Sequence, residues 1–509
     1  MSEKMKIKAK SEKAKKEPLS PKTKKKILII TIVSVLVVAI VGTGVGLYFY
    51  FNPPEPPAVE YTRPESRVYY YAIQEGDSSG FSIDTSWLND VPADKVSVSA
   101  EEQVGLTLTS DFVLKNNGAK IGDKATFNFV YDNKVISKVV AMVVKVNATI
   151  STVEEFIALS KDENTQGKVY LQTKDIDLQG KTVSFNEFNG SYFGNNHKLD
   201  NFSYAINGGL FKETRSGEIV GVKLTNVVGN VDINTSKNCG VLIGKAQSTA
   251  VTGCYVDGEI GVTQKTTVPL SVYVGGIVGY ATCQQRNYDY STSKEIKDCY
   301  SRVKISVSAD GNNYAIGGIV GGSRNYSVVN SSFNGSINVN VNNPDTLENL
   351  YVGGIAGTLE KIYEGAQNVQ YLDYGNMLEN KGEISVSVTG GSDGKTLYVG
   401  GIFGLLINHC LVNGYNLGKI SINAGRCNTF AGGIVGNAVN TTVMDMELRG
   451  VSVTNEVNLS SLGTVYAGGV AGYTNKVEVS KVNRSVTPSI SSGDTSKTQL
   501  ANEAVAKAE

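Results

Sequence analysis

Histidine, tryptophan and cysteine are scarce in this chain of 509 residues, which holds two His, one Trp and six Cys. No His-Glu-x-x-His segment occurs, which excludes the zinc-protease site that this motif builds. His197 and His409 lie far apart, and neither has the sequence surroundings of a Ser-His-Asp triad. No Cys-x-x-Cys pair, EF-hand or glycine-rich calcium repeat is present. The sequence therefore predicts no catalytic residue, no metal ligand and no cofactor.

Only one segment of the sequence suggests a pair of catalytic carboxylates. Asp175 and Asp177 in "DIDL" are separated by one residue on a predicted strand, so both would point to the same face. A glycosidase needs two carboxyl groups that face each other across a cleft. We therefore predict that these two aspartates are structural or turn residues, and that the protein is not an enzyme.

The formal net charge of zero hides an asymmetry. Residues 1–26 hold eleven Lys and three Glu, a net charge of +8, so the remaining residues carry −8. A lysine-rich segment can bind nucleic acid, but next to a membrane helix its ordinary roles are orientation and attraction to anionic lipids. We expect a basic cytoplasmic tail at 1–26 and no nucleic-acid partner.

A long apolar run follows this tail. Ile27–Phe51 contains 25 residues without a charge, and about 20 apolar residues span a bilayer as a helix. The adjacent lysines place residues 1–26 in the cytoplasm and the bulk of the chain outside the cell. A cleaved signal peptide is the alternative, but "LYFYFNPPEPP" offers no small-residue cleavage site. The sequence predicts a single-pass signal anchor at 27–51 and a stiff proline-rich spacer at 52–60.

Residues 61–148 alternate between apolar and smaller or polar residues. This period of two is typical of half-buried strands, and turn signals such as "EGDSSG" and "YDNK" separate the runs. Several short strands in fewer than about 90 residues suggest an immunoglobulin-like sandwich. The segment resembles the Ig-like spacers of bacterial surface proteins.

Residues 149–493 contain an internal repeat. Phrases such as "YVGGIVGY" recur, and their last glycines are Gly244, Gly279, Gly321, Gly357, Gly404, Gly436 and Gly472. Between them recurs a second phrase, as in "VTGCYVDGEIGV" and "IKDCYSRVKISV". Spacings of 32 to 47 residues mark a solenoid or a propeller.

Each repeat predicts three short strands, one in the glycine phrase and two in the second phrase with a turn between them. Three strands fit one coil of a three-faced, right-handed parallel β-helix. A propeller blade would need four antiparallel strands with hairpin turns. We expect an all-β chain: a transmembrane helix, an Ig-like sandwich and a β-helix. A capping helix within 151–159 would close the first coil, where Ser151 or Thr152 precedes Glu154 and Glu155. Residues 494–509 are predicted to be a capping helix or a polar tail.

The repeat resembles the GLUG-motif repeat of bacterial surface proteins. The lead-in segments "STVEEFIAL", "YLQTKDIDLQGK" and "FNGSYFGNNHKLDNF" strengthen this resemblance, which covers roughly 340 residues. Lys212 in "GGLFK" and the missing second glycine in "GVLIG" depart from the pattern. The resemblance implies a β-helix at the cell surface and no common set of catalytic residues.

Two sets of residues are candidates for function. Cys254 in "GCY" and Cys299 in "DCY" occupy equivalent places in adjacent repeats, and Cys410 in "HCL" is expected to match them. Stacked cysteines could form a disulfide outside the cell, but a ladder of buried thiols is the favoured alternative. Tyrosines flank the glycine phrases and could bind an extracellular glycan or protein, or could stack as a structural ladder; they are Tyr273, Tyr280, Tyr351, Tyr398, Tyr466 and Tyr473.

The function expected from the sequence is adhesion or surface interaction by a membrane-anchored adhesin-like protein without catalysis. A polysaccharide-cleaving β-helix enzyme is one alternative, because this architecture also hosts such enzymes. It would need Asp, Lys and Arg gathered on one face of adjacent coils, and the repeats alone do not supply such a cluster. A cell-envelope assembly component is the other alternative.

Overall fold

The computed structural model describes residues 67–88, 91–102, 104–204, 208–233, 238–264, 271–283, 294–309, 312–362, 373–391, 394–442, 445–484, 488–492, 498–500 and 505–508. The predicted basic tail, transmembrane helix and proline-rich spacer, residues 1–26, 27–51 and 52–60, lie outside the described residues. Within the described part of the chain, no helix has the length and apolar character needed to cross a bilayer. The described residues belong to one compact unit.

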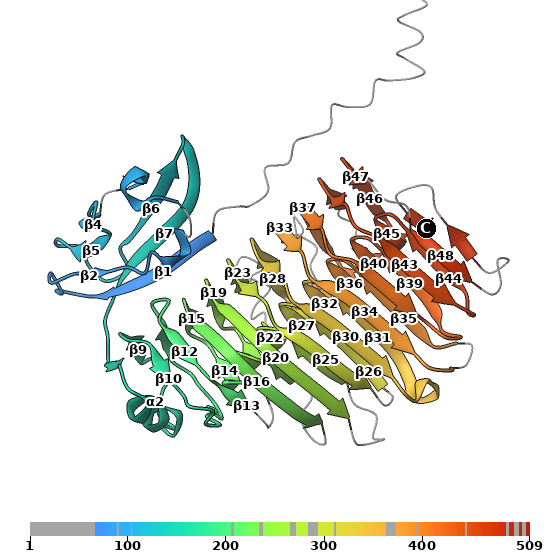
Figure 1. The fold of residues 1–509 in the computed structure, drawn as a ribbon, viewed down its shortest axis with the longest axis horizontal. Coiled ribbons are helices and arrows are strands. Elements are labelled where there is room, and N and C mark those ends of the chain that lie inside the picture. Colours follow the sequence, from blue (N-terminus) through green and yellow to red (C-terminus); the bar gives the residue numbers. More distant parts are fainter. Residues whose placement is uncertain are drawn as a thin grey trace, which may run out of the picture. The chain divides into compact units, whose positions relative to one another are not determined.

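The first part of this unit, the β-module, consists of two sheets around a common core (Figure 1). One sheet has the order β1-β7-β6-β3, formed by Arg67–Gln74, Lys134–Val144, Lys124–Tyr131 and Ser97–Ala100. The other has the order β2-β5-β4, formed by Phe81–Ser82, Val113–Asn116 and Leu106–Leu108. Two short 3-10 helices, Ser86–Leu88 and Ala93–Lys95, connect β2 to β3.

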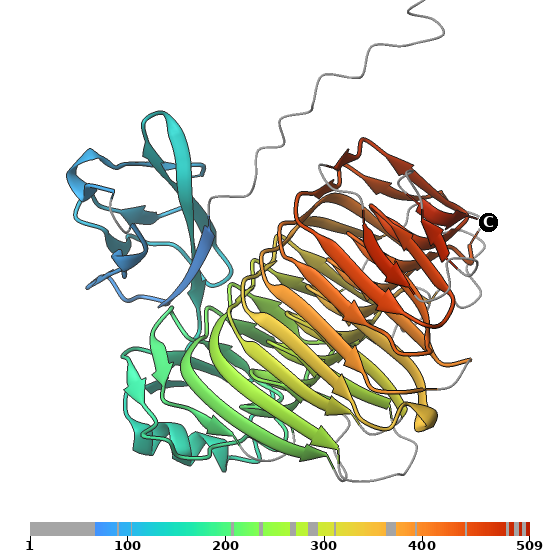
Figure 2. The same cartoon turned by 45° about the vertical axis from the view of Figure 1, so that its right-hand side comes forward.

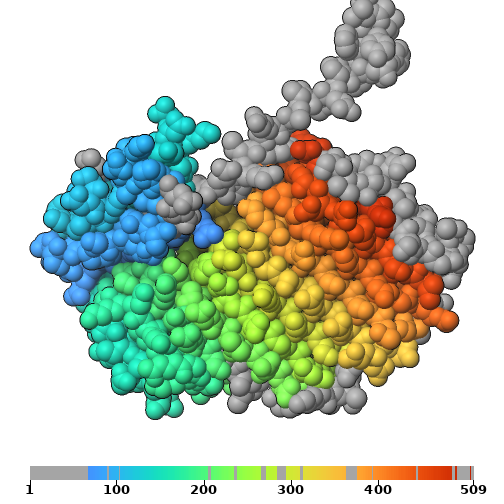
Figure 3. All heavy atoms as spheres, viewed as in Figure 1, coloured from blue at the N-terminus to red at the C-terminus, as the bar shows by residue number. Residues whose placement is uncertain are grey.

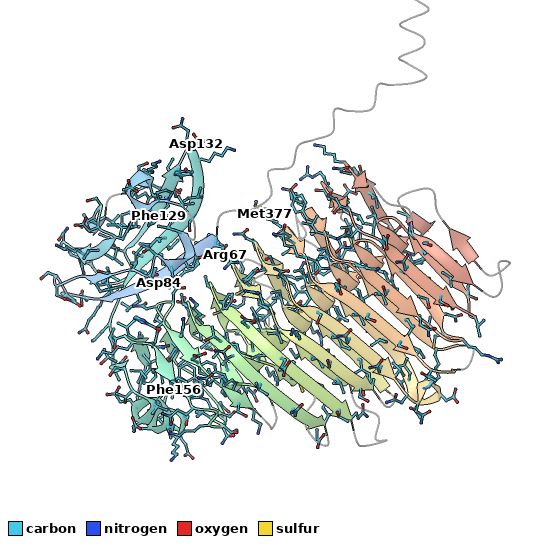
Figure 4. The ribbon with its side chains drawn as sticks, in the orientation of Figure 1. Arg67, Asp84, Phe129, Asp132, Phe156 and Met377 are labelled. Carbon is cyan, nitrogen blue, oxygen red and sulfur yellow. The ribbon has the colours of Figure 1, made fainter. Side chains whose placement is uncertain are left out.

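The core of the β-module follows from the alternation in its sequence. In β6 the residues Ala125, Phe127 and Phe129 point inward and are buried, while the residues between them are partly exposed. Phe129 is fully buried (Figure 4) and stacks on Phe112 with ring centroids 5.6 Å apart. The strand β1 runs parallel to β7 and antiparallel pairs form the rest of its sheet. The predicted all-β module is present.

The second part is a β-solenoid whose coils run through three parallel sheets (Figures 1 and 2). One coil illustrates the path: β21 in sheet 1, β22 in sheet 2, then β23, β24 and β25 in sheet 3. The next coil pairs with it in register, for example Val274 with Ile316 and Ile260 with Ile305. The predicted stacking of coils is thus confirmed.

The described strands of sheets 1 and 2 flank the glycine phrases. Sheet 1 is formed by β17 (Asn238–Gly240), β21 (Ser271–Gly275), β26 (Asn312–Gly317), β31 (Leu347–Gly353), β35 (Thr396–Gly400), β39 (Asn428–Gly432), β44 (Val465–Gly468) and β49 (Thr498–Leu500). Sheet 2 is formed by β14 (Phe211–Arg215), β18 (Ile243–Gln247), β22 (Val278–Thr282), β27 (Val320–Arg324), β32 (Ala356–Glu360), β36 (Phe403–Ile407), β40 (Val435–Val439), β45 (Ala471–Asn475) and β50 (Val505–Ala508).

Sheet 3 contains the second recurring phrase, and each coil bends once within this sheet, at a residue described below as part of the left-handed corner. Its first coils hold β8 (Ala148–Ile150), β9 (Val169–Gln172), β10 (Ile176–Asp177), β11 (Ser191–Phe193), β12 (Lys198–Asp200) and β13 (Ser203–Tyr204). Strands before or across the bend are β15 (Glu218–Val220), β19 (Ala250–Thr252), β23 (Lys294–Lys297), β28 (Tyr326–Val329), β33 (Asp373–Asn380), β37 (His409–Asn416), β41 (Met446–Arg449) and β46 (Val477–Ser480). Strands after it are β16 (Lys223–Ile233), β20 (Tyr255–Gln264), β24 (Tyr300–Ser301), β25 (Lys304–Ala309), β29 (Ser332–Phe333), β30 (Ser336–Val341), β34 (Glu383–Val388), β38 (Ile420–Asn423), β42 (Ser452–Val453), β43 (Val457–Ser461), β47 (Asn483–Arg484) and β48 (Ser489–Ser492).

The glycine phrases form the corner between sheets 1 and 2. The phrase was predicted to be one strand, but it ends one strand at Gly275 and begins another at Val278. A Cβ atom on Gly276 would overlap the carbonyl oxygen of Gly318 in the next coil. A Cβ atom on Gly279 would lie 2.6 Å from the carbonyl oxygen of Gly244 in the preceding coil. Glycine recurs here because the backbones of adjacent coils approach too closely for a side chain.

A second corner bends sheet 3. One residue per coil has a positive φ at equivalent register positions: Gly221 (60°), Gly253 (64°), Asp298 (54°), Asn330 (44°), Met377 (54°), Asn413 (58°), Gly450 (66°) and Lys481 (51°). Glycine, asparagine and aspartate adopt this left-handed conformation most readily. We call this row the left-handed corner. It replaces the plain turn expected between the second and third strands of each repeat.

The two ends of the solenoid differ. The predicted capping helix is present as α2 (Val153–Ser160), with a capping box between Thr152 and Glu155. Its Phe156 is fully buried against Phe185 and Tyr192 (Figure 4). At the other end, β49 and β50 pair with β44 and β45. These residues therefore form strands of the solenoid instead of the predicted helix or polar tail, because the last coil offers them unpaired backbone groups.

Candidate functional site

The predicted tyrosine row is a stack of rings along the solenoid. Tyr351, Tyr398, Phe430 and Tyr466 follow one another in sheet 1, and neighbouring rings are stacked at 4.8–5.2 Å with interplanar angles of 9–12°. Because the ring faces cover each other, a sugar ring cannot stack on them. This geometry agrees with the structural ladder among the two alternatives.

The remaining predicted tyrosines lie at the ends of this row. Tyr273 and Tyr280 contact each other across the corner, with ring centroids 4.5 Å apart. Tyr473 meets Phe430 edge-on at 6.0 Å. Burial raises the pKa of Tyr280 to about 12, with the neighbouring Tyr273 and Glu360 adding to the shift. All of these tyrosines are half-buried.

Two of the three predicted cysteines are neighbours in the structure, and the third lies elsewhere in sheet 3. Cys254 and Cys299 are neighbours in adjacent coils, because Tyr255 pairs with Tyr300. Cys410 lies four residues out of register, since Leu378 and Gly414 continue the column of Cys299 and Ser331. The short match "HCL" was misleading because the left-handed corner sets the register. All six cysteines are buried and lie in the described part of the chain, where none forms a disulfide, and burial raises the pKa of Cys239 to about 12.

The polar residues excluded from catalysis have structural partners. Asp175 accepts a hydrogen bond from the backbone of Lys198 at 2.9 Å and lies 3.3 Å from His197 Nδ1. Asp177 accepts hydrogen bonds from Gln179 N and Asn201 Nδ2. His409 is fully buried in β37.

A different site forms where strand β1 of the β-module crosses the left-handed corner. Asn195 bonds both backbone groups of Ala72: the Ala72 amide donates to Oδ1 at 2.7 Å, and Nδ2 donates to the Ala72 carbonyl at 3.0 Å. Asn196 Nδ2 donates to the carbonyl of Tyr70 at 2.8 Å. The side chains of these two buried asparagines thus form hydrogen bonds with the backbone at the edge of β1, as a neighbouring strand would.

Side chains complete this junction. Tyr70 lies over Gly253, and its hydroxyl donates a short hydrogen bond to Asp298. Burial and the Asp298 carboxylate both raise the pKa of Tyr70, which stays neutral. Tyr70 also belongs to an apolar cluster that joins the two parts: Ala72, Met142, Leu171, Phe193 and Val220. The β-module and the first coils are in direct contact (Figure 3).

Beside this contact lies a cavity of about 460 Å³, which we call the junction groove. Its floor follows one register column of sheet 3 across five coils: Lys223, Tyr255, Tyr300, Ser332 and Glu379. Its wall comes from the β-module, through Arg67, Val68, Tyr69, Asp84 and Ser86. Figure 4 shows Arg67 at the start of β1, with Asp84 on the β-module and Met377 on the solenoid. The volume is typical of small-ligand sites.

A stack of flat groups occupies one half of the groove. Tyr255 and Tyr300 are stacked with centroids 5.5 Å apart and an interplanar angle of 21°. The Arg67 guanidinium lies over the Tyr300 ring, 4.0 Å from its centroid. Such a cation–π contact orients the guanidinium. Arg67 is also hydrogen-bonded to the Tyr69 side chain, and a guanidinium has further N–H groups for a ligand. In the described part of the chain, no carboxylate forms a salt bridge with Arg67.

The carboxylates of the groove differ in the hydrogen bonds and ion pairs that they form. Asp298 bonds Tyr70 through Oδ2 and Asn330 Nδ2 through Oδ1 at 2.5 Å. Asp84 accepts from Ser86 N at 2.9 Å and lies 3.7 Å from Lys223 Nζ. Glu379 is only 3% exposed. Its Oε2 lies 2.9 Å from Lys381 Nζ, but its Oε1 is buried without a hydrogen-bond partner among the described residues. An unpaired buried acceptor costs about 1–3 kcal/mol.

Besides the unpaired Glu379 oxygen, the groove has a second energetically unfavourable feature, the backbone conformation of Met377. Met377 is the methionine of the left-handed corner, with a φ of 54°, while the adjacent coils have Asn330 and Asn413 there. A left-handed conformation costs a non-glycine residue about 1–3 kcal/mol. The strained backbone of Met377 and the unpaired carboxylate oxygen of Glu379 thus lie two residues apart in the chain. Such conflicts are typical of functional sites.

Sequence reasoning missed this groove because its residues come from both parts of the chain. Arg67 and Asp84 belong to the β-module, whereas the repeats supply Lys223, Asp298 and Glu379. One signal was available: Gly253, Asp298 and Asn330 precede the recurring "CY" or "SF" phrase, and these residue types favour a left-handed corner. No protein-family model, curated protein or solved structure matches the chain.

Proposed function

We propose that this protein is a membrane-anchored surface protein that binds a neutral, hydroxyl-rich glycan in the junction groove, and that it mediates adhesion without cleaving the glycan. The observation that carries the proposal is a pair of groups in the groove that can still bind a ligand. Among the described residues, Arg67 contacts Tyr69 and Tyr300 but has no carboxylate partner, and Glu379 Oε1 is an acceptor without a donor. A sugar hydroxyl is both donor and acceptor, so neighbouring hydroxyls can satisfy both groups.

The charges of the groove favour a neutral ligand. Arg67, Lys223 and Lys381 are balanced by three carboxylates, those of Asp84, Asp298 and Glu379. An anionic glycan would bring a carboxylate or sulfate toward the unpaired Glu379 oxygen, where like charges repel. The ring pair of Tyr255 and Tyr300 adds an apolar surface beside these polar groups.

Six ionisable groups in one groove also favour a second candidate, a polysaccharide-cleaving enzyme. Glycosidases require two carboxyl groups, one as acid and one as base or nucleophile. Both oxygens of Asp298 are bonded to Tyr70 and Asn330, so this carboxylate is poorly placed for that role. Binding therefore accounts for the groove better than cleavage. Product analysis of a glycan that binds, after prolonged incubation, separates the two candidates.

The proposal includes finer assignments that follow from the sequence. We take Ile27–Phe51 as the membrane anchor, with the groove on the extracellular side. We take the β-module as immunoglobulin-like and the solenoid as a right-handed β-helix of the GLUG-repeat type. The parallel pairing of β1 with β7 supports the immunoglobulin-like assignment, and the glycine corners support the β-helix assignment.

A glycan array with the full-length chain in detergent tests the proposal. Neutral oligosaccharides should bind, and titration calorimetry should then show at least tenfold weaker binding for Arg67→Ala and for Glu379→Gln. This magnitude corresponds to the loss of one hydrogen bond to a charged group, about 1.5–3 kcal/mol. Arg426→Ala and Glu383→Gln, both at exposed positions outside the groove, should bind within twofold of the wild type. Absence of any neutral ligand, or equal effects of groove and control variants, would overturn the proposal.

A further inference from the structure

We infer that the ligand is an extended glycan chain, whose further units lie in a second hollow on the same strands of sheet 3. This inference rests on the proposed function of the junction groove. The hollow has a volume of about 740 Å³ and is lined by Asp257, Glu259, Arg302, Lys304, Asn334 and Ser336, among others. We call it the strand hollow.

The strand hollow begins two residues beyond the groove on three successive coils. Tyr255 of the groove is followed by Asp257, Tyr300 by Arg302, and Ser332 by Asn334. Tyr255 and Asp257 lie on one strand, where residues two apart share a face and lie about 7 Å apart. Arg302 and Asn334 lie in the short links that join β24 to β25 and β29 to β30. Arg302 and Asn334 are exposed, so both can reach a ligand that leaves the groove along the strands.

A β-bulge shapes the hollow. The pairing of β16 with β20 shifts register between Leu224 and Val227, and Asn226 there has a φ of 53°. Gly258 opposite the bulge has a φ of 145°, and a Cβ atom on it would overlap the carbonyl oxygen of Val227. Bulges re-aim side chains and are frequent beside binding sites. The hollow is thus built into the backbone at this end of the sheet.

Tyr255 connects the two cavities. Its ring lies in the groove, while its hydroxyl donates to Asp257 Oδ2 at 3.3 Å and is hydrogen-bonded to Arg302. The hollow also repeats the charge balance of the groove, with Asp257 and Glu259 against Arg302 and Lys304. A neutral chain can therefore continue from one cavity into the other without meeting an excess of either charge.

Chain-length dependence of binding tests this inference. We suggest a series from disaccharide to octasaccharide of the tightest neutral glycan found on the array, titrated into the full-length chain. The wild type should gain at least tenfold in affinity between the shortest and longest members. Arg302→Ala and Asn334→Ala should remove most of this gain and leave disaccharide or trisaccharide binding unchanged. Arg426→Ala serves as the control and should retain the gain.

The outcomes separate the two proposals. If short members bind but affinity does not rise with length, the inference about the hollow is wrong and the groove proposal stands. If Arg302→Ala weakens short and long members equally, Arg302 belongs to the groove and the separate hollow is contradicted. If no member binds, both proposals fail. Circular dichroism of the variants, whose changed residues are exposed, verifies that they are folded.

Discussion

Gly253 of the left-handed corner lies directly beneath the ring of Tyr70, and a Cβ atom on Gly253 would overlap Cδ2 of that ring. The two residues are far apart in the sequence, but their contact holds β1 of the β-module against the second recurring phrase of the solenoid. The same ring carries the hydroxyl that bonds Asp298 one coil farther on. The wall and the floor of the junction groove are therefore fixed to each other at this point.

Substitution of Gly253 by alanine should separate the effect of this contact from that of backbone strain. We expect Gly253→Ala to lower the free energy of unfolding by about 3 kcal/mol or more, from strain at positive φ together with the clash. Gly180→Ala is the matched control, because Gly180 has a φ of 70° but no atom within 4 Å of a Cβ atom. The control variant should lower the free energy of unfolding only by the cost of backbone strain, about 1 kcal/mol. Urea unfolding curves measure both, and equal losses would contradict the contact.

The glycine corner between sheets 1 and 2 should also not tolerate a side chain, although the backbone φ of its Gly318 is not positive. A Cβ atom on Gly318 would overlap both the Phe333 ring and the carbonyl oxygen of Gly354 in the next coil. Gly318→Ala should therefore cost several kcal/mol, about as much as other overpacked core substitutions or more. Gly375→Ala should cost less than about 1 kcal/mol, because its nearest neighbours are side-chain atoms at 3.3–3.6 Å. A stable, unperturbed Gly318→Ala variant would be incompatible with the stacked coils.

Met377 should be replaceable by asparagine with a gain in stability. Asn330 and Asn413 hold the same conformation in the adjacent coils, so Met377→Asn should raise the free energy of unfolding by about 1 kcal/mol. The reciprocal change Asn413→Met should lower it by a similar amount. Thermal unfolding of the two variants checks the pair. A large loss for Met377→Asn would mean that the methionine side chain itself is needed.

Glu360 should destabilise the fold at neutral pH. Burial raises the pKa of this glutamate, and the opposing effect of Arg324, which faces it from the next strand, is smaller. Tyr273, Tyr280 and Tyr351 also lie near it. An acid with a raised folded-state pKa binds its proton more tightly when folded, so stability falls as pH rises from its unfolded pKa through the folded one.

The replacement Glu360→Gln should therefore raise the melting temperature at pH 7, and the difference should vanish near pH 4, where the wild-type carboxyl is protonated. Glu456 is a control of opposite sign, because hydrogen bonds from Asn458 and Lys419 lower its pKa. Glu456→Gln should give no gain at pH 7. A pH-independent effect of Glu360→Gln would show that packing, and not ionisation, is responsible.

The repeat architecture was predictable because its signals are local. Each glycine phrase marks a place where neighbouring backbones nearly touch, and the alternating "EISVSV" type of phrase marks strands with one buried face. The capping box at Thr152 was predictable for the same reason. What could not be predicted was the register: the match of Cys410 to Cys299 depended on the cysteine alone, whereas the bend at Met377 and Asn413 decides the alignment.

The junction groove was beyond prediction for a different reason. It depends on the contact of Tyr70 with Gly253 and on two buried asparagines, Asn195 and Asn196, which bond the backbone of β1. The distance in sequence between Tyr70 and these residues follows no repeat, and the segment "FGNNHKL", which holds both asparagines, gives no sign that they bond β1. Only the folded chain brings Arg67 beside Tyr300 and shows that Glu379 is buried with one oxygen unpaired.

A crystal structure of the full-length chain with the tightest neutral oligosaccharide is the most direct measurement of the central claim. We expect the sugar in the junction groove, with hydroxyl groups within hydrogen-bond distance of both the Arg67 guanidinium and Glu379 Oε1. A sugar bound along the tyrosine stack or elsewhere, with Glu379 Oε1 still unpaired in an empty groove, would contradict it.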